Sequence, residues 1–172
     1  MKKVVILFVA ILMLSVSCVV MKTNETFAVD ENGLILERGK NILVATPADG
    51  EYDGQVYTGT GKGVAESLRE ELNDYASSVK ISKAESFEKF SASEINSFDY
   101  FFVPTIIHWE DGIKSQYSID VKVTYDIYNK NKQLLNSFDI EIDSSGSSQN
   151  DAAPIDFIYK VLENNLYQVF KE

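Results

Sequence analysis

The sequence is poor in several of the residue types that build active sites. Its 172 residues include one cysteine, one histidine and one tryptophan. A single cysteine excludes an internal disulfide and a zinc site made of several thiolates. Basic residues are also scarce, with 16 lysines and arginines against 26 aspartates and glutamates and a net charge of −10. So acidic a chain repels nucleic acid and anionic headgroups, which excludes functions built on phosphate contacts.

The first 17 residues have the pattern of a secretory signal peptide. Lys2 and Lys3 precede an uncharged apolar run, and small residues follow at 15–17. This is the arrangement of a cleaved leader rather than of folded structure. The apolar character continues to Met21, so an uncleaved membrane anchor is the alternative, because a spanning helix needs ~20 apolar residues.

Cys18 favours cleavage over an uncleaved anchor. It directly follows the small residues, and the segment resembles a bacterial lipobox, in which the thiol receives a diacylglycerol and becomes the new amino terminus. Ser15 departs from the leucine usual at that position. A chance cysteine in an apolar segment is the alternative. If Cys18 is acylated, no thiol nucleophile remains, and Val19 rather than aspartate after it favours the outer membrane, facing the periplasm.

Three segments follow from this interpretation. We expect a lipoprotein signal peptide at 1–17, a lipidated tether at 18–40 and a single α/β domain at 41–172. Loss of the two lysines of the signal peptide leaves 14 basic against 26 acidic residues, for a net charge of −12.

The apolar pattern of the domain predicts eight elements. Consecutive apolar positions predict strands buried on both faces at 42–45 and 99–109. Helical spacing predicts helices at 63–76, 82–90 and 154–170, and Ser82 and Glu85 have the spacing of a capping box. Alternation of polar and apolar residues predicts strands at 78–82, 116–129 and 134–143. The predicted order is therefore β-α-β-α-β-β-β-α.

These elements fit one mixed five-stranded sheet in the order 2-1-3-4-5. The second strand is short and has one polar face, so it belongs at an edge. Right-handed crossovers then place helices on both faces of the sheet. The strand order reverses between strands 1 and 3, and open α/β sheets bind ligands outside the carboxyl ends of strands at such a point.

Two segments are predicted to meet at that switch point, the loop "PADGEYDGQVYTGTGKG" and the strand end "HWED". The loop is longer than usual for such a connection, and long loops in compact domains tend to be functional. Aromatic side chains at a crevice mouth are typical of recognition surfaces, so the tryptophan is expected to be partly exposed there. The candidate binding crevice consists of Tyr52, Tyr57, Lys62, His108, Trp109, Glu110 and Asp111.

Neither segment contains a complete catalytic or metal-binding motif. "GTGKG" is neither a Walker A sequence nor G-x-G-x-x-G; its amides could form a weak anion nest, or its glycines could simply permit positive-φ turns. Strand alternation places His108 and Glu110 on one face, with Trp109 and Asp111 on the other. Two ligands on one strand do not make a metal site, and a base without a nucleophile does not make a triad. We therefore expect no catalytic residues, no metal and no cofactor; ordinary packing of the strand end is the alternative to a binding role.

With both segments identified, the chain resembles a bacterial lipoprotein family, domain of unknown function 4823. The resemblance rests on "VATPADG", on two tyrosines leading into "GTG", on "VPTIIHWED" and on an alternating strand pair, over residues 41–143. The family often continues with an arginine and a second tryptophan where this chain has "GIKSQYS". The element order is also similar to the TolB amino-terminal domain and to periplasmic domains of curli-secretion and penicillin-binding-protein-activator lipoproteins, which implies an adaptor rather than an enzyme.

The sequence thus predicts a lipid-anchored envelope protein that is not an enzyme but a binding or assembly module. Its expected partners are the membrane, through the lipid, and an envelope protein or the cell wall, with no nucleic acid. Two alternatives stay open. One is a periplasmic small-molecule-binding lipoprotein that uses the crevice, and the other is a hydrolase that uses His108 with Glu110 or Asp111.

Overall fold

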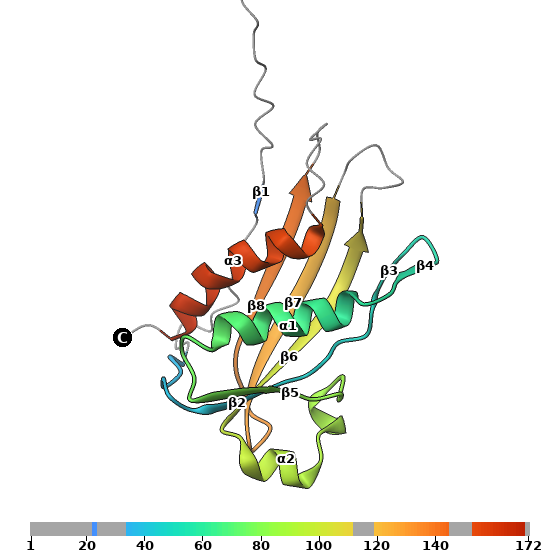
Figure 1. Ribbon diagram of the computed structural model, residues 1–172. Helices are drawn as coiled ribbons and strands as arrows, with labels where there is room; N and C mark the ends of the chain where they lie inside the picture. Colours follow the sequence, from blue (N-terminus) through green and yellow to red (C-terminus); the bar gives the residue numbers. More distant parts are fainter. Residues whose placement is uncertain (1–21, 24–33, 112–118, 145–152, 171–172) are drawn as a thin grey trace, which may run out of the picture.

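A computed structural model describes residues 22–23, 34–111, 119–144 and 153–170 (Figure 1). The predicted signal peptide and Cys18 lie outside the described residues. The strands are β1 (Lys22–Thr23), β2 (Asn41–Val44), β3 (Gly50–Tyr52), β4 (Gln55–Tyr57), β5 (Ser78–Ile81), β6 (Tyr100–Glu110), β7 (Ile119–Asn129) and β8 (Leu134–Ser144). The helices are α1 (Thr60–Leu72), the 3₁₀ turn η1 (Phe87–Lys89), α2 (Ala92–Ser97) and α3 (Pro154–Val169).

The main sheet confirms the predicted α/β class and the relative order of the five predicted strands. Its order is β1-β8-β7-β6-β2-β5, with β2 parallel to β5 and β6, and with β6, β7 and β8 antiparallel. Two details differ from the prediction. The short strand β1 adds a sixth member beside β8, and β3 and β4 form a separate two-stranded ribbon inside the predicted long loop.

The core lies between one face of the sheet and the helices α1 and α3, which run side by side across it (Figure 1). Strict alternation along β7 and β8 directs every second side chain into this layer. Tyr125 of β7 stacks on Phe138 of β8 with ring centroids 4.9 Å apart. The core-facing positions of the two strands are Val121, Val123, Tyr125, Ile127, Phe138, Ile140 and Ile142. The helices bury their predicted apolar stripes against them.

Within the described part of the chain, the helical elements that cover the opposite face of the sheet lie near β2 and the start of β6. There Phe87 and Phe90, from η1 and its carboxyl end, pack against Leu43 and Phe101. The predicted helix at 82–90 is wrong, because only one 3₁₀ turn forms there. The capping box belongs instead to Ser91 and Glu94 at the start of α2. Both serine–glutamate pairs have the same spacing, so the pattern alone does not distinguish them.

The folded domain begins before residue 41, which corrects the predicted end of the tether. Leu36 is 3% exposed and its N–H donates to the Val169 carbonyl at 2.9 Å. The Arg38 guanidinium lies over the Tyr75 ring, 4.8 Å from its centroid. Further upstream, β1 pairs with β8, with Lys22 opposite Asp143. No helix within the described ranges is long and apolar enough to cross a membrane.

Candidate functional site

A β-bulge decides which way the side chains of the "HWED" segment point. The register of β6 on β7 shifts between Ile106 and His108, and the extra residue, Ile107, is 57% exposed. Ile106 therefore pairs with Val123 and Trp109 with Val121, so both face the core side of the sheet. His108 and Glu110 face the other side, as the alternation predicted. Asp111 follows the last residue of β6.

Trp109 is part of the core, which corrects the expectation of an exposed indole at a crevice mouth. It is only 2% exposed. The backbone of Gly50 lies directly against it, since a Cβ at residue 50 would be 2.4 Å from Trp109 Cβ and 3.2 Å from Ile106 Cγ2. Tyr57 also packs against the core from its edge. The two predicted segments do meet, and at Gly50 and Trp109 they meet as a close-packed contact.

The start of α1 is tied to the same loop by polar contacts. Gly61 N–H donates to Asp49 Oδ1 at 2.9 Å, so the protein's own carboxylate engages one of the amides that could form the weak anion nest. The Thr60 hydroxyl accepts from Gly50 N–H and donates to the Tyr57 carbonyl, both at 2.8 Å. Together these bonds hold the β3–β4 ribbon onto the first turn of α1.

The glycines of "GTGKG" have different reasons for being glycine. Gly59 has a φ of +92°, which agrees with the alternative of a positive-φ turn. Gly61 instead permits a close approach, because a Cβ there would lie 2.1 Å from the Pro47 carbonyl oxygen. Gly63 has neither constraint, since a Cβ there would make ordinary contacts at 3.5 Å with Ile155.

On the outer face of the sheet, His108 and Glu110 meet Asp120 of β7. One nitrogen or oxygen from each residue lies within 4.8 Å of the other two. His108 Nε2 is 3.5 Å from Asp120 Oδ2, and the Tyr52 ring packs edge-on against the imidazole with centroids 5.1 Å apart. Burial raises the pKa of Asp120. His108 lowers that pKa, while the neighbouring acids raise it further.

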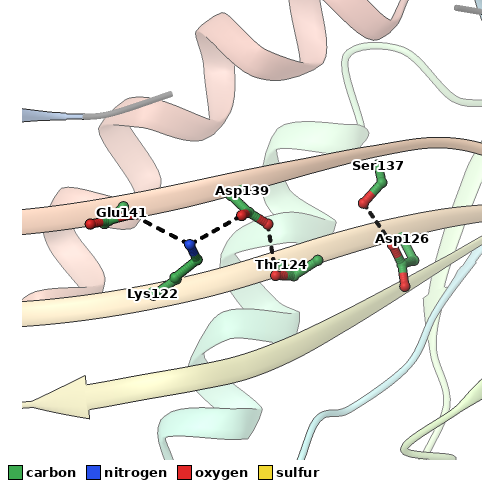
Figure 2. Close-up of polar contacts among 6 residues, drawn as sticks. All are labelled: Lys122, Thr124, Asp126, Ser137, Asp139 and Glu141. Atoms are coloured by element: carbon green, nitrogen blue, oxygen red, sulfur yellow. Dashed lines mark hydrogen bonds and ion pairs between the residues drawn. The ribbon is translucent and has the colours of Figure 1, made fainter. Parts of the chain in front are cut away.

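Next to this cluster, β7 and β8 carry a polar surface with ordered contacts (Figure 2). Lys122 Nζ lies 3.3 Å from Asp139 Oδ2 and 3.5 Å from Glu141 Oε2. The Thr124 hydroxyl donates to Asp139 Oδ1 at 2.7 Å. One row further, the Ser137 hydroxyl donates to Asp126 Oδ1, also at 2.7 Å. Each of these acids therefore has a donor on a neighbouring strand.

Comparison with known proteins agrees with this architecture. The family profile described as "Domain of unknown function (DUF4823)" matches residues 34–145, more than half of the chain. The chain belongs to this family. A search of curated proteins gives no match.

Solved structures are similar to this DUF4823 protein at low sequence identity. PelC from Paraburkholderia phytofirmans, described as a dodecamer, has a TM-score of 0.62 and 14% identity, over 88% of this chain and 97% of PelC. A DUF330 protein from Xanthomonas campestris has a TM-score of 0.49 and 15% identity, over 81% of this chain and 86% of that protein. The PelC similarity shows the fold alone.

In this DUF4823 protein, the motifs that carry the family resemblance converge on one joint. This joint holds the β3–β4 ribbon between β6 and α1. It is made by Asp49 and Gly50 of "VATPADG", Thr60 and Gly61 of "GTG", and Trp109 of "HWED". Much of the motif is therefore accounted for by packing. His108 and Glu110 are different, because they point away from the joint to the outer face.

The predicted crevice residues do not all come together. Lys62 lies on the exposed side of α1, where it pairs with Glu66 at 3.5 Å, and α1 covers the sheet face opposite His108. A cleft of about 400 Å³ does exist, but it lies between β2, β5 and α2, at the other end of the sheet. Its walls include Asn41, Lys80, Glu94 and Phe98, none of which was predicted.

Asp120 is the member of the outer cluster that sequence analysis missed. The alternation along β7 does place Asp120 on the polar face. Its position opposite Glu110 depends on the register of β6 on β7, and that register includes the bulge. Without the register, the sequence shows only two potential ligands on one strand, which do not make a metal site.

Proposed function

We propose that this protein is a lipid-anchored module of the bacterial cell envelope that acts without catalysis, by binding a partner through the outer face of β6–β8. Acylation of Cys18 anchors the chain, with Val19 favouring the outer membrane and a domain facing the periplasm. The partner is an envelope protein or a cell-wall component. The expected acidic character of the mature chain argues against nucleic acid as that partner.

The observation that carries the proposal is the acidic face of three long strands, over most of which no helix of the described residues lies. Five acidic side chains project from it, those of Glu110, Asp120, Asp126, Asp139 and Glu141. Lys122 lies on the same face and is already engaged by two of these acids. The helices α1 and α3 cover the opposite face, and η1 and α2 reach only the far end of this one. A broad surface of one sign favours a partner of complementary charge.

Two further observations favour binding over catalysis. Enzyme sites are concave, whereas the joint between the β3–β4 ribbon and β6 is packed too closely to admit even a methyl group at Gly50. In addition, PelC, which has the same fold, is described as a dodecamer. A second copy of this chain is therefore one candidate for the partner.

Site-directed photo-crosslinking in cells that produce the full-length chain tests the proposal. A photoreactive residue at Thr124, on the outer face, should give a discrete crosslinked product. The same residue at Tyr159, which is exposed on α3, is the matched control and should not give that product. Mass spectrometry of the product identifies the partner, including a second copy of this chain.

The charge of the face provides the second arm of the experiment. Replacing Asp139 and Glu141 with lysine should abolish the crosslink from Thr124 while the protein stays folded by circular dichroism. An equal crosslink from Tyr159, or one that survives the charge reversal, would show that the outer face is not the binding surface. If folded His108→Ala caused the same cellular defect as absence of the protein, with the crosslink intact, the hydrolase alternative would instead be favoured.

A further inference from the structure

The acids of the outer face are arranged differently at the two ends of the strands. In the rows that contain Asp126, Asp139 and Glu141, a serine, threonine or lysine stands directly across the strand pair. The row at the other end instead places Glu110, Asp120 and Asp143 on three neighbouring strands. Like charges directly opposite each other destabilise a sheet, so a bound cation would stabilise this row.

His108 contributes a nitrogen to this acidic row. Its Nε2 atom is inaccessible to solvent and has no hydrogen-bond partner among the described residues, although a third of the side chain as a whole is exposed. A buried polar atom without a partner is uncommon and calls for an explanation. Lys122, the cross-strand neighbour of His108, does not resolve it, because its ammonium group is held by Asp139 and Glu141.

The spacing of these atoms is that of ligands around a metal ion. Nitrogen and oxygen ligands lie about 2.0–2.2 Å from zinc in a tetrahedral site, which places two of them roughly 3.4 Å apart. His108 Nε2 and Asp120 Oδ2 are 3.5 Å apart. Glu110 is close enough to complete a set of three, since all three atoms lie within 4.8 Å of one another.

We propose that His108, Glu110 and Asp120 bind a divalent transition-metal ion, with Zn²⁺ as the natural probe. Imidazole favours such ions over Mg²⁺ and Ca²⁺, which prefer oxygen ligands alone. Three protein ligands leave a position for water or a partner group. The ion offsets the charge of the acidic row and joins the end of β6 to the start of β7. The site is independent of the binding proposal above, because it does not require a partner.

The single histidine makes the test direct. In the purified full-length chain, stripped of metal and held in detergent, the imidazole NMR signals belong to His108 alone. Zn²⁺ should shift these signals and raise the melting temperature, a chelator should reverse both effects, and Mg²⁺ should produce neither. Competition with a chromogenic chelator then gives the affinity.

Matched variants test whether Zn²⁺ binds to these three side chains or only to the general negative charge of the outer face. His108→Gln and Asp120→Asn should each weaken Zn²⁺ binding by at least ~10-fold. Glu141→Gln, a neutralised acid on the same face that is not one of the three ligands, should bind like wild type. Absence of Zn²⁺ binding by the wild-type chain, or equal weakening in Glu141→Gln and Asp120→Asn, would overturn the site. Trp109 fluorescence monitors folding of each variant, and Asp120→Asn, at a half-exposed side chain, decides the matter if His108→Gln unfolds.

Discussion

At the scale of single residues, the fold depends on a few positions where the backbone itself is the packing partner. Gly50 is the sharpest case, because the Trp109 indole occupies the space that any side chain would need. Gly63 lies only thirteen residues along the chain, yet it has room for a methyl group. These two glycines therefore provide a matched pair for testing whether the joint is as tight as the distances indicate.

We expect Gly50→Ala to lower the free energy of unfolding by about 1–3 kcal/mol, because overpacking forces the surrounding groups to move. Gly63→Ala should raise it by about 0.5–1 kcal/mol, because alanine restricts the unfolded chain and suits the interior of α1. Urea denaturation followed by Trp109 fluorescence measures both. If Gly50→Ala is as stable as wild type, the joint is looser than its contacts imply.

A second residue-scale prediction concerns Tyr125, at the centre of the sheet. Its hydroxyl is buried and has no hydrogen-bond partner within the described ranges, and burial raises its pKa. Tyr125→Phe should therefore raise the free energy of unfolding by about 1 kcal/mol, since the cost of burying an unpaired hydroxyl disappears.

Tyr128 is the matched control for this change. Its hydroxyl donates to Asp126 Oδ2 at 3.3 Å, so Tyr128→Phe should be neutral or slightly destabilising. The two variants are compared in the same urea titration. Equal effects of the two substitutions would mean that the Tyr125 hydroxyl has found a partner, such as an ordered water.

At the scale of elements, the sequence predicted what periodicity controls. The alternation from Val121 to Ile127 specified both the strand and its buried face, and the two-face burial of β2 and β6 placed them inside the sheet. The bulge at Ile107 could not be predicted, because two consecutive isoleucines, Ile106 and Ile107, give no sign of which one is extra. That one residue decides that Trp109 rather than His108 enters the core.

The misplaced second helix shows the same limit of local patterns. Ser82–Glu85 and Ser91–Glu94 are equivalent as sequence, but only the second pair caps a helix. The difference is tertiary, because Glu94 also accepts a hydrogen bond from the Ser82 hydroxyl at 2.7 Å. The first serine thus supports the cap of the second, and this arrangement links the end of β5 to α2.

This arrangement predicts a pH dependence of stability. Hydrogen bonds from Ser91 and Ser82 lower the pKa of Glu94 from its usual 4.5, so its ionised form is favoured in the folded state. The resulting stability is present above the unfolded pKa and is lost as the pH falls through the lower, folded pKa. Glu94→Gln keeps an acceptor for these bonds but loses its charge, so it should be less stable than wild type at pH 7 by on the order of 1 kcal/mol.

The difference between wild type and Glu94→Gln should shrink as the pH is lowered below 4.5. Urea titrations at a series of pH values measure it. Glu51→Gln, on the exposed β3 strand, serves as a control and should match wild type at neutral pH. A difference between wild type and Glu94→Gln that persists unchanged in acid would show that the carboxylate's charge does not contribute to the cap.

At the scale of the whole molecule, the short strand β1 places the amino-terminal segment relative to the sheet. Lys22 pairs with Asp143 close to the end of β8, beside the row that contains Glu110 and Asp120. Cys18 is four residues earlier, and four extended residues span at most ~14 Å. A lipid on Cys18 would therefore hold that end of the strands near the membrane surface, rather than at the far end of a long tether.

This geometry has a function only if Cys18 carries the lipid, which is the last prediction. The wild-type chain should incorporate radiolabelled palmitate, lose residues 1–17 and fractionate with membranes. Cys18→Ala should neither incorporate palmitate nor lose residues 1–17, because no other cysteine exists to accept the acyl group. Mass spectrometry of the mature amino terminus gives the cleavage position and the acyl mass together. Equal labelling of the two proteins, or a mature chain that retains residues 1–17, would replace the lipid anchor with an uncleaved apolar one.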